Sequence, residues 1–196
     1  SKYKNFEMNA NELFEIIKSR RAVFPAQYSE EEITESELNQ IMETANWAPT
    51  HKRTEPWRFK IIKDKAKQRF AEFLVKKFME NTPLENQTER KKLDIIDKCN
   101  QSHTIILIHQ KTSGLLPEWE ELAATYMAVQ NMWLMCTALG IGAYWSSTST
   151  ILQMDEFLPI EENEKCIGVF YMGKLKGELV PGVRKPMADK IQLIQN

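Results

Sequence analysis

The sequence predicts an α+β or α/β domain in which helices pack on a sheet. Helical and strand patterns alternate along the 196 residues, an arrangement typical of these two classes. The continuous apolar run between His103 and Gln110 is typical of a fully buried central strand. The longest apolar stretch, from Leu122 to Trp145, indicates a helix buried in a core or in a subunit interface. These patterns leave the strand order open.

The N-terminal part of the chain predicts two amphipathic helices. The first covers residues 9–18, with Asn9 or Asn11 as its N-cap. The second begins after Thr34, because Thr34 followed three residues later by Glu37 forms a capping box. The inner faces of the two helices are Leu13, Ile16 and Ile17 in the first, and Leu38, Ile41, Met42 and Ala45 in the second.

The rest of the chain continues the alternation and then ends in a tail. Aromatic and β-branched runs predict the strands, and 3.6-residue spacing predicts the helices. These elements are strands at 57–63, 103–110, 142–147 and 165–174, and helices at 65–80, 88–100, 118–139 and 151–157. Glycines and prolines after residue 174 predict an extended arm over about 175–196. The length fits one domain over 1–196, and the composition of 81–100 does not decide whether they form part of a lid.

Charge and cysteine usage limit the classes of function. The formal net charge of −1 gives no general attraction to nucleic acid or to anionic membranes, so any anion site must be local. Cys99, Cys136 and Cys166 are widely spaced, which predicts reduced, buried thiols in the cytoplasm. Residues 1–20 are charged throughout, which is unlike a signal peptide, and polar residues interrupt the longest apolar stretch, unlike a membrane span.

Several catalytic classes lack their motifs here. His103 and His109 are six residues apart on a predicted strand, so about 20 Å separates them. We therefore expect both to be structural and expect no metal site. The sequence contains no HExxH, Walker loop, GxSxG or strand-linked GxGxxG, which speaks against zinc proteases, nucleotidases, serine hydrolases and a Rossmann dinucleotide site.

Two segments carry the chemistry that the sequence does suggest. Residues 47–59 begin where a helix ends and finish where a strand begins, and the loop between them contains a histidine, two cations and two prolines. A stiff polar loop with aromatic ends can bind a flat, anionic ligand. The second segment, Ser19-Arg20-Arg21-Ala22, lies at the end of the first predicted helix.

Purely structural explanations exist for the same residues. Arg20 and Arg21 at a helix C-terminus can complement the helix dipole, and His51 can be an inert loop residue. Trp145 can belong to the core, and Arg184 can be a surface charge. Trp57 and Phe59 alternate with Arg58 on the predicted strand, so they are expected to face the core.

Four motifs in this order resemble the nitroreductase family of flavin enzymes. They are residues 17–22, residues 48–59, residues 140–147, and Gly173 followed by Arg184-Lys185-Pro186. Pro117-Glu118-Trp119-Glu120 strengthens the likeness to a compact branch of that family. The resemblance implies an α+β fold, a three-layer α/β/α sandwich with a mixed, mainly antiparallel central sheet. It also implies an intertwined homodimer joined through the central helix and the arms.

The resemblance further implies an FMN-dependent oxidoreductase with FMN held non-covalently between subunits. Hydride would pass from NADH or NADPH through the flavin N5 to a nitroaromatic, quinone or similar small molecule in a ping-pong cycle, with no catalytic side chain. A phosphate carrying about −1.5 to −2 charges favours guanidinium partners. The implied flavin contacts are Arg20 and Arg184 at the phosphate, Arg21 with the backbone around Ala22 at the pyrimidine edge, Trp145, Ser146 and Ser147 along the ring, and Trp47 and His51 from the partner subunit.

Two departures from the family pattern restrict what can be carried over. Arg53 and Glu55 stand where many members have Asn and Gln, and Val23 and Phe24 stand where many have a Lys. We transfer no flavin contact to these positions. Two alternatives remain: a flavin-binding module without turnover, such as a sensor or carrier, and an interaction protein whose aromatic helix forms a dimer core.

Overall fold

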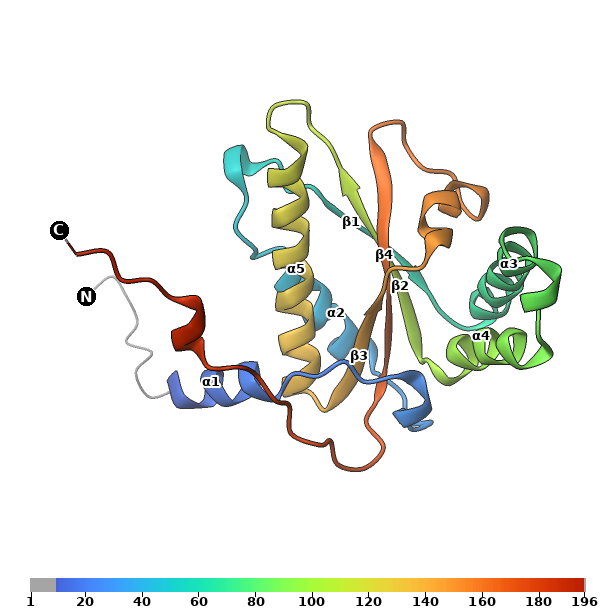
Figure 1. Ribbon diagram of the computed structural model, residues 1–196, viewed down its shortest axis with the longest axis horizontal. Coiled ribbons are helices and arrows are strands. Elements are labelled where there is room, and N and C mark those ends of the chain that lie inside the picture. The colour runs from blue at the N-terminus through green and yellow to red at the C-terminus, as the bar shows by residue number, and fades with distance from the viewer. Residues whose placement is uncertain (1–9, 196) are drawn as a thin grey trace.

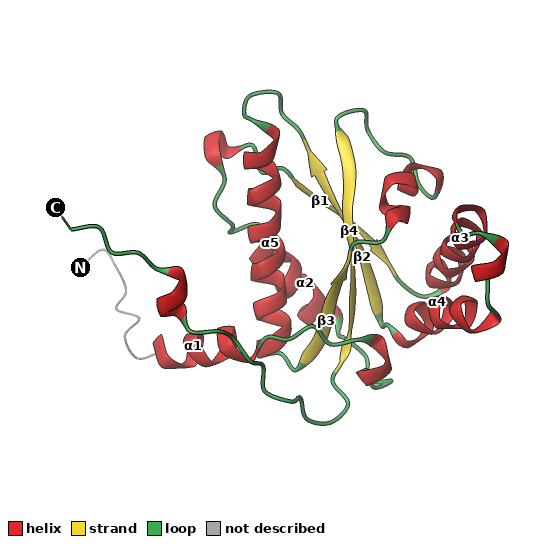
Figure 2. Cartoon of the chain, in the orientation of Figure 1, coloured by secondary structure: helices red, strands yellow, loops and turns green. Residues whose placement is uncertain are grey.

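One four-stranded sheet lies between two layers of helices (Figures 1 and 2). The computed structural model describes residues 10–195. The strands are β1 (Trp57–Ile62), β2 (Thr104–Lys111), β3 (Ile141–Ser146) and β4 (Glu164–Lys174). They lie in the order β1-β2-β4-β3, and every pairing within the described residues is antiparallel. The predicted three-layer α+β arrangement with a mainly antiparallel sheet is confirmed; the described part of the sheet contains no parallel pair.

Helices α2 (Glu35–Ala45) and α5 (Glu118–Ala138) cover one face of the sheet. The predicted capping box starts α2: the Thr34 hydroxyl accepts from the Glu37 N–H at 3.1 Å, and the Glu37 carboxylate accepts from the Thr34 N–H at 2.9 Å. One side of α5 is buried and the other, including Trp119, is exposed. No helix within residues 10–195, α5 included, is long and apolar enough to span a membrane.

Helices α3 (Lys65–Asn81) and α4 (Glu89–Gln101) lie over the opposite face of the sheet (Figure 1). The predicted buried strand is confirmed, because residues 105–108 of β2 are wholly buried. The short helix predicted at 151–157 is a 3-10 helix over Ser149–Glu156. Trp57 is buried and Phe59 packs against the same core, as expected. All three cysteines are free and buried, also as predicted.

Helix α1 (Ala10–Ser19) and the C-terminal arm extend from the side of the molecule that carries α5 (Figure 1). None of the residues of α1 is buried. The described part of the arm is extended except for a 3-10 turn over Met187–Lys190. Asn9, one of the two predicted N-caps, lies outside the described residues.

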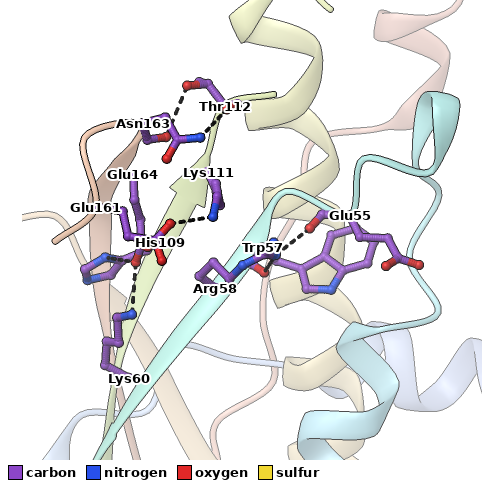
Figure 3. A network of polar contacts seen from close by, with 10 residues as sticks. All are labelled: Glu55, Trp57, Arg58, Lys60, His109, Lys111, Thr112, Glu161, Asn163 and Glu164. Carbon is purple, nitrogen blue, oxygen red and sulfur yellow. Dashed lines mark hydrogen bonds and ion pairs between the residues drawn. The ribbon is translucent and has the colours of Figure 1, made fainter. Parts of the chain in front are cut away.

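A buried polar network closes the end of the sheet where β1 begins and β2 ends (Figure 3). The Glu164 carboxylate lies 3.1 Å from Lys60 Nζ and 2.9 Å from His109 Nδ1. Burial lowers the pKa of His109, although the charge of Glu164 opposes this shift. His109 therefore lies inside the fold beside a paired carboxylate, consistent with the structural role expected from the sequence.

Candidate functional site

Three arginine side chains converge where the end of α1 meets the C-terminal arm. Arg20 is half-buried, and burial, followed by the charges of Arg184 and Arg21, lowers its pKa below the ordinary value for arginine. Two ends of the chain therefore meet at one point. Among residues 10–195, none of the three guanidiniums pairs with a carboxylate. Positive charges that repel one another and lack a counter-ion favour an anionic ligand.

Trp133 of α5 packs against this arginine cluster. The Arg20 guanidinium carbon lies 4.6 Å from the centre of the Trp133 ring, which is a cation–π geometry. The Trp133 indole N–H donates to the Arg21 carbonyl at 3.0 Å. The ring in turn packs edge-on against Phe170 of β4. Sequence reasoning missed Trp133, because a tryptophan within an apolar helix does not reveal that its ring faces a cation.

Arg21 holds the C-terminal arm in place. Its Nε donates to the Val180 carbonyl at 3.1 Å, and its Nη1 donates to the carbonyls of Lys18 and Arg20 at 3.1 and 2.9 Å. The arm passes directly over this guanidinium, since a Cβ on Gly182 would lie 2.5 Å from Arg21 Cζ. Arg21 thereby positions the segment that carries Arg184. Its predicted contact with a flavin remains a prediction.

The segment that follows the arginines runs along the edge of the sheet. Ala22 is exposed, and the next residue, Val23, donates its N–H to the Ala143 carbonyl of β3 at 2.9 Å. The Tyr28 hydroxyl donates to the Val23 carbonyl at 2.6 Å. Because β3 is an edge strand, these bonds fix the arginine cluster beside the free edge of the sheet.

The last residues of β3 point to different sides of the sheet. Trp145 lies on the α5 face, with its ring centre 5.0 Å from that of Tyr126. It packs flat over Gly168, where a Cβ would come within 2.3 Å of the indole. Ser146 instead lines a cavity on the α3 side, and Ser147 is exposed. The three predicted ring contacts are thus adjacent in the chain but do not form one wall within a single subunit.

The loop before β1 has a strained backbone. Lys52, Arg53 and Glu55 have φ values of 52°, 53° and 43°, a left-handed region that non-glycine residues seldom adopt. The Thr50 hydroxyl accepts from the Glu55 N–H at 3.0 Å, and Arg58 donates to the Glu55 carbonyl at 2.7 Å (Figure 3). Such strain persists where surrounding contacts hold it and is frequent at ligand sites.

The same loop presents the other two predicted ligand contacts. His51 Nδ1 lies 2.7 Å from the Glu120 carboxylate at the start of α5. The Trp47 side chain is 78% exposed, and its indole N–H donates to the Glu43 carboxylate at 3.0 Å. Sequence reasoning missed Glu120 as the partner of His51, because this pairing joins segments that only the tertiary fold brings together.

The predicted contacts therefore form two separate groups along α5. One group lies beside Trp133 and contains the arginines, and the other lies beside Glu120 and contains His51. At a rise of 1.5 Å per residue, about 20 Å of helix separates the two positions. The two groups therefore lie well apart within one subunit.

Comparison with known proteins shows which family the chain is similar to. The profile described as the Nitroreductase family matches residues 17–174. Over 187 residues the chain is 25% identical to YfhC of Bacillus subtilis (strain 168), provisionally named an NAD(P)H nitroreductase, covering 91% of this chain and 92% of that protein. A nitroreductase-like family protein from Bacillus cereus has a TM-score of 0.81 at 19% identity, covering 100% of this chain and 99% of its own. The FMN-dependent nitroreductase NfnB from Mycobacterium smegmatis, crystallised with NADPH, has a TM-score of 0.72 at 18% identity, covering 94% and 99%.

Proposed function

The chain belongs to the nitroreductase family, and from this premise we propose that it is an FMN-dependent oxidoreductase. It would oxidise NADH or NADPH and reduce a small molecule such as a quinone or a nitroaromatic compound. YfhC and NfnB carry names that match this activity. When bound, FMN supplies hydride transfer at its N5 atom, so the protein contributes binding and orientation rather than an acid or base.

The arginine cluster is the observation that carries this proposal. Arg20 and Arg184 repel each other, and neither has a carboxylate partner within residues 10–195. A phosphate would supply the missing negative charge and accept forked hydrogen bonds from both guanidiniums. Trp133 limits the rotamers of Arg20, and Arg21 fixes the arm, so the cluster is held in place before a ligand arrives. These features fit the phosphate of FMN.

A homodimer would complete the site. Helices α1 and α5 and the C-terminal arm lie on the same side of the molecule (Figure 1). All three expose large apolar residues, and exposed apolar patches mark protein interfaces. These residues include Phe14, Ile17, Trp119, Tyr126, Met127, Val180 and Val183. A two-fold dimer that pairs the α5 helices in opposite directions would bring the His51 group of one subunit near the arginines of the other. Trp47 and His51 would then contact the ring from across the interface.

The remaining expectations belong to the same proposal. Residues 1–196 would form one FMN-binding domain with a C-terminal arm. The exposed Ala22 backbone and the residues around Ser146 and Ser147 would lie along the flavin, beside the edge of β3. Three free, buried thiols suit a reducing compartment such as the cytoplasm.

Titration with FMN tests the phosphate assignment directly. Replacing Arg20 or Arg184 by Ala should raise the FMN dissociation constant about 10- to 150-fold, which corresponds to about 1.5–3 kcal/mol for a hydrogen bond to a charged group. Arg69→Ala is the matched control, because Arg69 is an exposed arginine on α3, away from the cluster, and it should leave the affinity unchanged. Fluorescence of free FMN measures all three variants.

Two outcomes would overturn the proposal. A colourless protein that takes up no added FMN would remove the cofactor, and unchanged affinity in both Arg20→Ala and Arg184→Ala would remove the phosphate site. Consumption of NADH or NADPH with a quinone or nitroaromatic acceptor tests turnover separately. Bound FMN without such consumption would identify a flavin-binding module instead of an enzyme.

A further inference from the structure

One side-chain hydrogen bond joins the strained loop before β1 to helix α5. His51 Nδ1 lies 2.7 Å from Glu120 Oε1, and Glu120 belongs to the first turn of α5. Figure 1 shows the 3-10 turn His51–Arg53 beside this end of the helix. Among residues 10–195, no other side-chain hydrogen bond or ion pair joins residues 50–55 to α5. The contact of His51 with Glu120 is therefore the polar link between the loop and the helix.

The loop needs contacts from outside itself because its backbone is strained. Lys52, Arg53 and Glu55 have positive φ values, and residues in this region keep it only where surrounding contacts impose it. Within the loop, the His51 carbonyl accepts from the Thr54 N–H at 3.3 Å. This bond closes the turn but does not fix the direction of the His51 ring. The bond to Glu120 supplies that direction.

The same bond determines which ring nitrogen of His51 stays open. An ionised carboxylate carries no proton and can only accept hydrogen bonds, so Nδ1 donates and carries the proton. The other nitrogen, Nε2, makes no hydrogen bond to any residue in the described range 10–195. The His51 side chain is 57% exposed, so Nε2 is accessible. In a histidine, the bond made by one nitrogen sets the proton on the ring and the direction of the other nitrogen.

Glu120 is itself held by the helix. Its backbone N–H donates to the Pro117 carbonyl at 3.0 Å, and a negative charge is favourable at a helix N-terminus. Glu118, in the same turn of α5, pairs with Lys165. Within residues 10–195, no lysine or arginine pairs with Glu120. In this part of the chain, its carboxylate therefore pairs with His51 alone.

We propose that Glu120 is a positioning residue, which holds the His51 imidazole so that Nε2 faces the flavin site across the dimer interface. The inference rests on the proposed function, in which His51 contacts the ring of FMN from the partner subunit. Glu120 does not touch the cofactor. It restricts the rotamer of His51 and the place of its proton before FMN arrives, so less conformational freedom is lost on binding.

Nitrogen-15 NMR of the FMN-free protein tests the place of the proton on His51. The chain has three histidines, so histidine-labelled protein gives few signals, and His51→Ala identifies the signals of His51. At about pH 8.5, where a free imidazole is neutral, the parent should carry the proton on Nδ1. In Glu120→Ala the proton should move largely to Nε2, the nitrogen that carries it in most free histidine side chains. A parent with the proton on Nε2 alone would overturn the proposal.

A double-mutant cycle with FMN tests whether Glu120 acts through His51. In the parent, Glu120→Ala should raise the FMN dissociation constant roughly 2- to 12-fold, the effect of one neutral hydrogen bond. In a His51→Ala chain the same change should alter the constant less than about twofold, because no imidazole is left to orient. Fluorescence of free FMN gives all four constants. Equal losses in both backgrounds would assign Glu120 to the stability of the loop or the helix, and would overturn the proposal.

Two further variants separate the contact with His51 from the negative charge. Glu120→Gln keeps a hydrogen-bonding group at the same place, so its FMN affinity should stay within about twofold of the parent value. Glu118→Ala is the matched control, because it removes a carboxylate from the same turn that pairs with Lys165 instead of His51, and it should leave the affinity unchanged. A loss in either variant as large as in Glu120→Ala would show that charge matters rather than the contact.

Failure of this inference can be told apart from failure of the proposed function. If the parent binds FMN and Glu120→Ala binds it equally well, Glu120 has no positioning role and the function stands. If the parent takes up no FMN, the function falls and this inference falls with it, whatever the NMR signals of His51 show.

Discussion

Helices α1 and α2 have similar lengths and similar patterns but different surroundings. α2 has 11 residues and buries Leu38, Ile41 and Ala45 against the core. α1 has 10 residues and buries none; Phe14 is 59% exposed and Ile17 is 45% exposed. Both helices nevertheless have an apolar side with helical spacing.

The difference shows that periodicity predicts which side of a helix is covered but not which molecule covers it. The cover of α2 is α5 and the sheet of the same chain. The apolar side of α1 is left largely exposed within residues 10–195, at Phe14 and Ile17. We attribute its apolar character to the partner subunit. Substitutions in the two helices should therefore affect different equilibria.

The largest expected effect comes from a charge on the apolar side of α1. Phe14→Asp removes the burial of a phenylalanine, about 1.5–3 kcal/mol, and does so twice in a symmetric dimer. The dimer dissociation constant should rise about 10²- to 10⁴-fold, while the unfolding of the single chain changes little. Sedimentation equilibrium measures this constant. Glu12→Ala, on the polar side of α1, is the control, and a Phe14→Asp dimer as tight as the parent would contradict the assignment.

A cavity where α2 packs against the core should weaken folding rather than dimerisation. Ile41 is wholly buried, so Ile41→Ala should lower the free energy of unfolding by about 2–5 kcal/mol. Denaturant unfolding measured by circular dichroism reports this loss. If Ile41→Ala altered dimerisation more than folding, the distinction between the two helices would be wrong.

Local patterns predicted most of the fold because they depend on neighbouring residues. Spacing placed the helices within a few residues, and the Thr34–Glu37 capping box forms as expected. The pairing of Arg20 with Arg184 followed from motifs at both ends of the chain rather than from any local pattern. The direction of Trp145 was not predictable, because it depends on the pairing of β3 with β4.

Two further features could not be predicted from the sequence: the strained backbone before β1 and the contact by which Arg21 holds the arm. Nothing in the residue types of Lys52, Arg53 or Glu55 requires a positive φ, since tertiary contacts impose it. Arg21 holds the arm through a hydrogen bond to the backbone carbonyl of Val180. Because every residue has a backbone carbonyl, the sequence does not indicate which one Arg21 binds. The sequence therefore predicted which residues could contact a ligand, and these contacts stay predictions. It did not predict which of these residues hold other parts of the chain in place.

The smallest expected effect is the acid sensitivity of the α2 cap. The hydrogen bond from Lys174, followed by the one from the Thr34 backbone, lowers the pKa of Glu37. A carboxyl whose folded-state pKa is lowered stabilises the fold above its unfolded pKa, about 4.3, and loses this contribution as pH falls through the folded value. Glu37→Gln should therefore flatten the fall in Tm below about pH 4.3. Thermal melts of both proteins between pH 3 and 7 test this, and an unchanged slope would contradict it.

Mixing two defective chains tests most directly whether each flavin site is built from two subunits. One chain carries Arg20→Ala with Arg184→Ala, and the other carries Trp47→Ala with His51→Ala. Random pairing makes half of the dimers mixed, each with one site whose two halves are intact, so about a quarter of the parent's tight FMN sites should return. If the mixture binds FMN no better than the separate chains, the two groups do not meet across an interface.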